Sequence, residues 1–198
     1  MLELRNVSFS YGKKKVLDNF SMHLGDGEIL AVMGPSGCGK STLLSLIAGL
    51  KRADAGEVLS TYSRIAFVFQ EPRLFPWLTV RENLLAPLEK SRRSEKEISA
   101  ALDTVMLPNA ASLYPDELSG GMKSRVALAR ALLFGGDLYL FDEPFAALDE
   151  ELRIALADRL RTHVKESGAS AILVTHQTSD AVRIADRSLT MNALPTDN

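Results

Sequence analysis

The stretch from Gly34 to Thr42 has the residue types and spacing of a loop that binds a phosphate chain. It reads GPSGCGKST and fits the pattern GxxxxGK[ST] in full. Glycines let successive backbone N–H groups turn toward phosphate oxygens, and a helix that starts after the loop adds its positive N-terminal end. In such a loop Lys40 reaches the β- and γ-phosphates of a nucleotide, and the Ser41 hydroxyl binds Mg²⁺. The predicted nucleotide-binding residues here are Gly34, Pro35, Ser36, Gly37, Cys38, Gly39, Lys40, Ser41 and Thr42.

Two adjacent carboxylates, Asp142 and Glu143, follow the apolar run Leu138–Phe141. A hard cation prefers carboxylate oxygen, so Asp142 is expected to hold Mg²⁺ directly or through water. Glu143 is expected to act as the general base that polarises the attacking water. Paired carboxylates also occur in solvated surface turns. The apolar run before them and Pro144 after them favour the catalytic interpretation.

Three further polar or aromatic residues carry weaker signals on their own. Gln70 ends another apolar run and is predicted to contact the γ-phosphate or the water, and to take part in the metal site. His176 ends a third run and is predicted to contact the same groups. Tyr11 offers a stacking surface for an adenine ring outside the phosphate loop. The alternatives are a loop glutamine, a structural histidine and a packing tyrosine.

The elements that position these residues are four short apolar runs, typical of strands buried on both faces of a parallel sheet. In open α/β sheets ligands bind beyond the carboxyl ends of the strands. A polar residue or motif follows each run, so we expect the four ends to form one pocket rim. The runs are Ile29–Met33, Ile65–Phe69, Leu138–Phe141 and Ala171–Val174.

The other segments have different periodicities. The first thirty residues alternate between apolar and polar types, as half-buried strands do. Capping boxes are expected where Thr79 precedes Glu82 and where Ser94 precedes Glu97, and Asp149 is expected to cap a later helix that Gly168 ends. The stretch from about 71 to 118 is predicted to be a mostly helical insertion. One apolar stripe is expected on its second helix, made of Ile98, Ala101, Leu102, Val105 and Met106.

A second anion-binding feature is predicted at Ser119, Gly120 and Gly121. Ser119 is a good N-cap, and the two glycines leave the first amide N–H groups of the helix uncovered. A capped helix alone does not explain two poor helix formers in its first turn. Apolar residues recur behind them at helical spacing and are expected to face the core: Met122, Val126, Ala129 and Leu133.

The segment LSGGM, followed by KSRVALARALL and then by LYLFDEPFAALD, resembles the signature of ATP-binding-cassette (ABC) ATPases. The motif order matches that family along essentially the whole chain. The resemblance makes Tyr11 the A-loop aromatic, Gln70 the Q-loop residue, Ala147–Asp149 the D-loop and His176 the switch histidine. Asp149 thereby joins the predicted nucleotide-binding residues.

The fold class implied is α/β, a P-loop NTPase with a RecA-like, mostly parallel sheet flanked by helices. An antiparallel β-subdomain is expected at the N-terminus, and a helical subdomain is expected as an insertion. We expect a single cassette, with residues 1–70 and 125–198 forming the β-subdomain and ATPase core and residues 71–124 forming the helical subdomain with the signature.

The sequence departs from the family pattern at three places. Met122 stands where glutamine is most frequent, and activity is expected to survive the change. The segment 56–70 is short, which predicts a trimmed hairpin. Only 22 residues follow His176, so no C-terminal regulatory domain is expected.

Composition limits the other possibilities. An apolar fraction of 46% and a charged fraction of 24% are ordinary for a soluble globular protein. The net charge of −2 gives no reason to expect a nucleic-acid partner. No apolar run reaches the ~20 residues of a membrane span and no signal segment opens the chain, so the expected location is cytoplasmic. The family resemblance further implies that the chain is peripheral on the inner face of the cell membrane.

The family resemblance implies partners as well. Two cassettes sandwich two ATP molecules, so a homodimer or a paired cassette is expected. Transmembrane permease subunits are expected to dock near Gln70–Leu84. The segments FPWLTVRENL (75–84) and YPDELSGGM (114–122) resemble those of bacterial importer ATPases for nitrate, sulfonates and taurine. An importer would also need a solute-binding protein. An exporter ATPase, a soluble non-transport cassette and a regulator that has lost hydrolysis are the alternatives.

Overall fold

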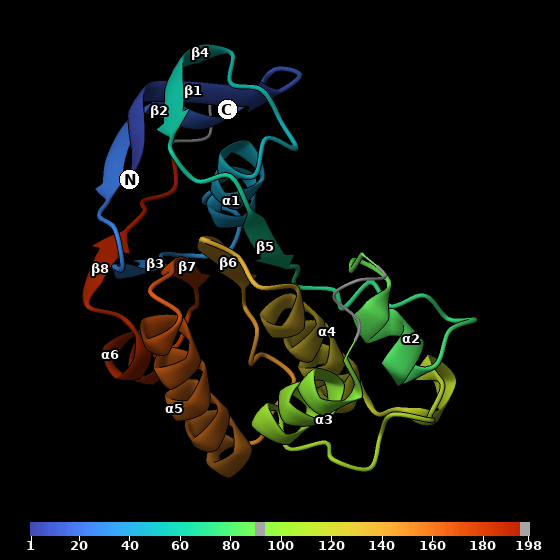
Figure 1. The fold of residues 1–198 in the computed structure, drawn as a ribbon. Coiled ribbons are helices and arrows are strands. Elements are labelled where there is room, and N and C mark those ends of the chain that lie inside the picture. The colour runs from blue at the N-terminus through green and yellow to red at the C-terminus, as the bar shows by residue number, and fades with distance from the viewer. Residues whose placement is uncertain (90–93, 195–198) are drawn as a thin grey trace.

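The computed structural model describes residues 1–89 and 94–194, which form two sheets with helices on both sides of the larger one (Figure 1). The smaller sheet has the order β2-β1-β4 and its pairings are antiparallel. The larger sheet has the order β5-β6-β7-β3-β8, and all its pairings are parallel. The predicted α/β class with an antiparallel N-terminal part is confirmed. The small sheet comprises β1 (Leu2–Tyr11), β2 (Lys14–Leu24) and β4 (Ala55–Ser60).

The four apolar runs are strands of the parallel sheet, as predicted. The sheet comprises β3 (Ile29–Met33), β5 (Ile65–Val68), β6 (Leu138–Asp142), β7 (Ser170–Val174) and β8 (Arg187–Thr190). Alternate residues of β6 enter different cores: Leu138 and Leu140 pack with the small sheet and the helix after β3, whereas Tyr139 and Phe141 pack with the helices on the other face. Continuous apolar sequence is required because both faces are covered.

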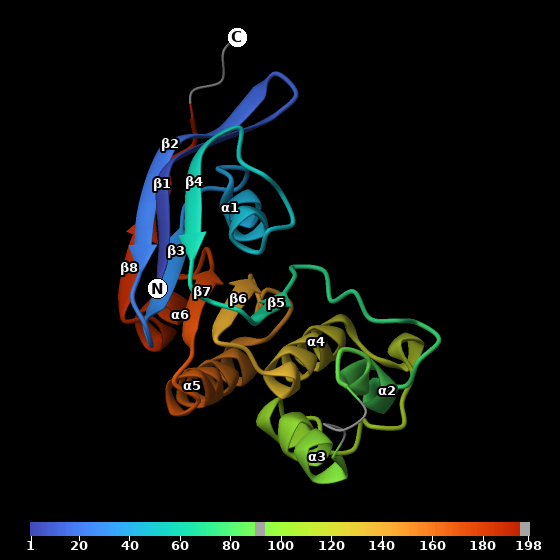
Figure 2. The same ribbon diagram turned by 45° about the horizontal axis from the view of Figure 1, so that its top comes forward.

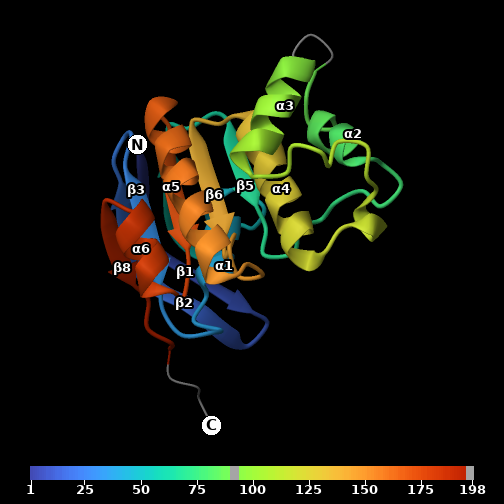
Figure 3. The same cartoon turned by 90° about the horizontal axis from the view of Figure 1, so that it is seen from below.

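The helices lie in three places. The helix α1 (Lys40–Ile47) packs between the two sheets (Figure 2). The helices α5 (Glu150–Glu166) and α6 (Thr178–Ile184) cover the opposite face of the large sheet (Figure 3). Beside β5 lie α2 (Val80–Leu85), α3 (Glu95–Thr104), a 3-10 turn (Pro115–Glu117) and α4 (Gly120–Phe134).

The capping predictions hold in most respects. Thr79 and Glu82 form a complete capping box, and the Asp149 side chain caps α5. Ser94 accepts the N–H of Glu97, which is one half of the predicted box. The prediction that the stretch 71–118 is mostly helical is wrong, because α2 and α3 have only six and ten residues and most of the other described residues there are loop. The division of the chain at 71 and 124 stays a prediction.

Two further expectations need correction. Met106 does not continue the apolar stripe of α3, because the helix ends at Thr104 and Met106 is exposed with φ +59°. The predicted trimmed hairpin at 56–70 is wrong in form, because β4 pairs with β1 and the next strand belongs to the other sheet. Asp137, just before β6, accepts the N–H groups of Ser63 and Arg64 and so directs the chain to the large sheet.

Candidate nucleotide-binding site

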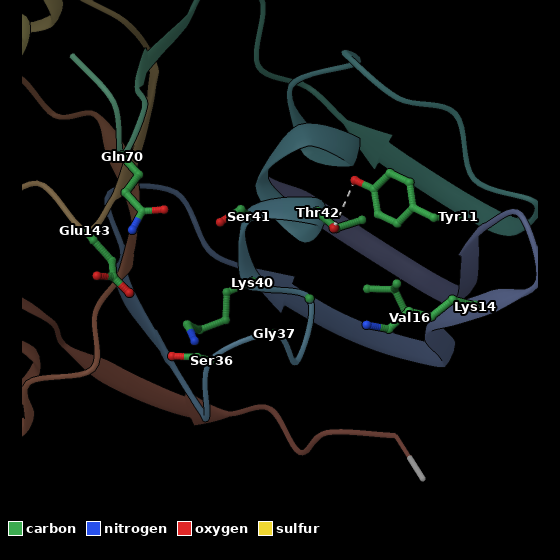
Figure 4. Close-up of a pocket in the computed structure, with 11 residues that line it drawn as sticks. Tyr11, Lys14, Val16, Ser36, Gly37, Lys40, Ser41, Thr42, Gln70 and Glu143 are labelled. Carbon is green, nitrogen blue, oxygen red and sulfur yellow. Dashed lines mark hydrogen bonds between the residues drawn. The ribbon is translucent and has the colours of Figure 1, made fainter. Parts of the chain in front are cut away.

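A cavity of about 300 Å³ lies where the loop after β3 meets the ends of β5 and β6 (Figure 4). The small sheet closes its other side. Loop residues, sheet-end residues and the tyrosine therefore share one pocket. Its lining residues are Tyr11, Lys14, Val16, Ser36, Gly37, Gly39, Lys40, Ser41, Thr42, Gln70 and Glu143.

The phosphate-loop backbone is shaped by glycine. Gly37 has φ +80° and Gly39, the N-cap of α1, has φ +104°, both in the left-handed region where side chains are strained. The buried Lys40 ammonium donates to the carbonyl oxygens of Gly34 and Pro35 at 2.8 and 2.9 Å. The lysine therefore holds its own loop in shape while its amine faces the cavity (Figure 4).

Three residues of the predicted phosphate loop, Gly34, Pro35 and Cys38, do not line the cavity. Gly34 and Pro35 contribute the carbonyl groups that Lys40 binds. Cys38 is 3% exposed, and a Cβ on Gly34 would lie 2.9 Å from its sulfur, so the thiol faces the protein interior. A buried thiol reacts slowly with alkylating reagents.

The opposite wall of the cavity carries Gln70 and Glu143. Figure 4 shows both side chains pointing across the cavity toward Ser41 and Lys40. Gln70 follows β5 and Glu143 follows β6, two neighbouring parallel strands. The ends of β5 and β6 therefore contribute side chains to one pocket rim, as the strand ends predicted.

The expected metal residues lie close to one another. Asp142 is 5% exposed, and burial raises the pKa of its carboxyl, although a hydrogen bond with Ser41 and the charge of Lys40 act in the opposite direction. The described residues contain no cluster of three or more His, Cys, Asp and Glu side chains able to hold a metal ion. One hydroxyl and one carboxylate fit Mg²⁺, which takes one or two protein ligands and completes its shell with phosphate and water oxygens.

His176 lies in a cleft next to the nucleotide cavity rather than in it. Its Nδ1 is 3.3 Å from Oε2 of Glu143, so Glu143 borders both hollows. Glu143 itself has φ +48°, an uncommon conformation for a residue with a side chain. Its N–H donates to the carbonyl of Val174, the last residue of β7, which ties the two strand ends together.

Tyr11 forms the far end of the cavity. Its hydroxyl lies 3.3 Å from that of Thr42, and its ring packs edge-on against Phe9. The Lys51 ammonium lies 4.8 Å from the centroid of the Tyr11 ring. Tyr11 is 48% exposed, which leaves ring surface for a base. Lys14 and Val16 also line this end. Sequence reasoning missed them; the signal was their position directly after the turn that follows Tyr11.

The second predicted anion-binding feature lies outside this cavity, and of its expected parts the structure shows the N-cap. Ser119 accepts the N–H of Met122 and caps α4, and neither it nor the two glycines line the cavity. Gly121 packs closely: a Cβ there would lie 2.9 Å from the carbonyl oxygen of Ala147. Gly120 has open space. The apolar residues behind them, Met122, Val126, Ala129 and Leu133, belong to or pack against the core, as predicted.

Comparisons with known proteins agree with this arrangement. The family described as ABC transporter matches residues 17–146. The chain is 40% identical to a sulfate/thiosulfate import ATP-binding protein of Bordetella parapertussis, over 97% of this chain and 59% of the relative. It is 42% identical to an aliphatic sulfonates import ATP-binding protein of Bacillus cereus, over 93% of this chain and 76% of the relative. The chain thus spans about 60% of the length of the sulfate/thiosulfate relatives.

Solved structures give the same family. The dimeric structure of a bacterial ABC transporter cassette has a TM-score of 0.88 and 32% identity, covering 97% of this chain and 94% of that one. The same cassette in a post-hydrolysis state, bound to ADP and Pi, has a TM-score of 0.87 and 30% identity, covering 98% and 96%. The fold, the phosphate loop and the sequence similarity lead to one conclusion: this chain belongs to the ABC transporter family.

Proposed function

We propose that this cassette hydrolyses ATP to energise the import of a small solute, and that two cassettes complete each site. One observation carries the proposal. The cavity contains the phosphate loop and Glu143, whereas Gly120 and Gly121 lie outside it with one of the two facing open space. An anion site at a helix N-terminus that is not used by its own chain suits the nucleotide of a second cassette.

Each residue has a role in this proposal. Lys40 and the amides of its loop bind the phosphates, and Tyr11 stacks on the base. Ser41, Asp142 and Gln70 hold Mg²⁺, which offsets phosphate charge when it is bound. Glu143 orients and polarises the attacking water, and His176 fixes the Glu143 carboxylate from the neighbouring cleft.

The permease is proposed to dock on the loop after Gln70. Leu74 packs against the core, but Phe75 and Trp77 are 41% and 71% exposed, with ring centroids 5.7 Å apart. Arg130 of α4 donates to the carbonyls of Pro72 and Arg73, which holds the loop to the helix of the signature residues. An exposed aromatic pair on a fixed loop suits a protein partner. No helix among residues 1–89 and 94–194 is long and apolar enough to span a membrane.

The transported solute is proposed to be of the kind named for the relatives, sulfate or thiosulfate in one group and aliphatic sulfonates in another. A solute-binding protein would deliver it, and the cassette would sit on the inner face of the membrane. Affinity purification from native membranes should recover a permease with the wild-type cassette and lose it with Trp77→Ala. Equal recovery with both would contradict docking at this loop.

A mixing experiment tests the two-cassette site. Lys40→Ala damages the phosphate loop and Gly120→Ala covers the anion site, so each variant alone should be inactive. In a mixed dimer one of the two sites combines an intact loop with an intact Gly120. With equal amounts of the two variants, about half of the dimers are mixed. The mixture should therefore regain roughly a quarter of wild-type hydrolysis if the sites act independently. A mixture no more active than the separate variants would contradict the composite site.

A further inference from the structure

Arg153 and Asp180 form a charge pair behind the candidate catalytic residues. Arg153 Nε lies 3.4 Å from Asp180 Oδ1, and the side chains are 15% and 6% exposed. Arg153 belongs to α5 and Asp180 to the first turn of α6. Both border the cleft of about 100 Å³ that also contains Glu143 and His176. Charged side chains this deeply buried require partners, so the pair fixes how the two helices meet.

The aspartate is connected to both neighbours of His176. Its Oδ2 accepts a hydrogen bond from the Thr175 hydroxyl at 3.3 Å. That same hydroxyl oxygen accepts the backbone N–H of Gln177 at 3.1 Å. His176 is therefore held from the residue before it and from the residue after it, through one hydroxyl that Asp180 orients.

The arginine is connected to the loop before α5. Its backbone N–H donates to the carbonyl of Asp149 at 3.0 Å, one helical turn earlier. The buried Nε of Arg153 has no hydrogen-bond partner among the described residues, so its position depends on the charge of Asp180. The pair thus links the start of α5 to the segment that presents His176.

We propose that Arg153 and Asp180 are positioning residues that hold His176 against Glu143. The proposal rests on the proposed hydrolytic function of this site and adds two residues to it. Neither side chain reaches the nucleotide cavity, so both act through the 3.3 Å contact between His176 Nδ1 and Glu143 Oε2. Because Asp149 and Arg153 are one turn apart, a displacement of the loop before α5 would reach His176 by the same route.

Kinetics of Asp180→Asn provide the first test, since this change keeps the size of the side chain and removes its charge. We expect kcat for ATP hydrolysis to fall about tenfold to a hundredfold, because small misplacements of catalytic groups have effects of this size. The KM for ATP should stay within about twofold, because the binding cavity is untouched. Asp180→Glu keeps the carboxylate and should restore most of the turnover. Arg153→Gln removes the opposite charge and should reproduce the loss, which keeps the test available if Asp180→Asn does not fold.

Asp158→Asn is the matched control. Asp158 accepts two hydrogen bonds from Nη1 of Arg183, at 2.8 and 2.9 Å, and so joins the same two helices on the surface. Among the described residues, Asp158 makes no hydrogen bond with Thr175 or Gln177, whereas Asp180 accepts one from Thr175. The kcat of the Asp158→Asn variant should match that of wild type. An equal loss in both variants would mean that helix packing in general sets the rate, and would overturn the proposal.

A second readout needs no ATP. The chain has three histidines, and ¹⁵N spectra of the labelled imidazoles report the surroundings of His176 directly. Its ring signals should move in Asp180→Asn and stay in place in Asp158→Asn. Unmoved ring signals in Asp180→Asn would overturn the proposal, with or without a loss of kcat. Absence of hydrolysis in the wild type would count against the proposed function alone, because the spectra still decide the positioning role.

Discussion

At the residue scale, Lys40 has a double part in the site. Its ammonium group is buried and donates to two carbonyls of its own loop. The same group faces the cavity in which Gln70 and Glu143 project from the other side (Figure 4). Removal of this one charge therefore affects both the shape of the loop and the attraction for phosphate.

Lys40→Ala is expected to lower kcat/KM for ATP by about 10²-fold or more, because the charge that stabilises the phosphates in the transition state is lost. Steady-state hydrolysis measures this. Circular dichroism of the variant serves as the check on folding. A folded variant with kcat/KM within about tenfold of wild type would contradict the assignment of Lys40.

The residue types at the site could be predicted from sequence better than their surroundings. The pattern GxxxxGK[ST] depends on local backbone geometry, and the positions of its glycines follow from the motif alone. The burial of Cys38 could not be predicted, because it depends on the approach of β8: a Cβ on Gly34 would lie 2.3 Å from the carbonyl oxygen of Met191. The position of His176 in a neighbouring cleft likewise depends on a contact between the ends of β6 and β7.

At the scale of elements, the start of α4 separates two glycines with different environments. A Cβ on Gly121 would press on the carbonyl of Ala147 and the side chain of Leu148, whereas a Cβ on Gly120 would meet nothing within 4 Å beyond its own helix backbone and chain neighbours. One glycine is therefore required by packing within this chain. Packing within this chain does not require the other.

Substitution of each glycine by alanine should separate these two needs. Gly121→Ala should lower the free energy of unfolding by about 1–3 kcal/mol, because the new methyl group is forced against backbone. Gly120→Ala should not lower it, since alanine is the better helix former. Urea unfolding of the two variants measures the difference. A greater loss of stability for Gly120→Ala would contradict the packing described for α4.

Asp186, just before β8, links the edge of the large sheet to α5 through hydrogen bonds. It accepts hydrogen bonds from Lys165 Nζ at 2.5 Å, from Arg161 Nη2 at 3.0 Å and from the N–H of Ile29 at 2.9 Å. Burial alone would raise the pKa of this carboxyl, but these hydrogen bonds outweigh it and hold the pKa below its ordinary value. The ionised form therefore stabilises the folded chain.

The pH dependence of Asp186→Asn follows from that lowered pKa. The stabilisation is complete above the unfolded pKa of about 3.9 and is lost as pH falls through the lower folded value. The variant should be less stable than wild type by about 1–3 kcal/mol at pH 7, with a difference that shrinks below about pH 4. Asp18→Asn, which removes an exposed ion pair with Lys15, is the control and should cost under about 1 kcal/mol. A difference between Asp186→Asn and wild type that is constant from pH 7 to pH 3 would contradict this role.

The elements that sequence patterns predicted well are those that bury two faces or carry a cap. The four apolar runs became strands of one parallel sheet, and Thr79 and Asp149 cap their helices. The stretch between 71 and 118 was predicted poorly because its helices are short and its loops are held by distant groups. Arg125 of α4, for example, donates to the carbonyls of Val105 and Met106.

At the scale of the whole molecule, the two predicted anion-binding features lie on different parts of the chain. The nucleotide cavity opens between the small sheet and the ends of β5 and β6. Ser119 caps α4 and the two glycines begin it, and this helix lies beside the large sheet (Figure 2). Dimeric cassettes are among its structural relatives. A second copy would allow each feature to serve one nucleotide.

The most direct test of this account is the oligomeric state of Glu143→Gln with ATP. The variant should retain the phosphate loop and Gly120 but turn over slowly, so bound ATP persists. Size-exclusion chromatography with light scattering should give a mass near 21.6 kDa without nucleotide and about twice that with Mg²⁺ and ATP. A monomer at saturating, demonstrably bound ATP would contradict the central claim that two cassettes share each site.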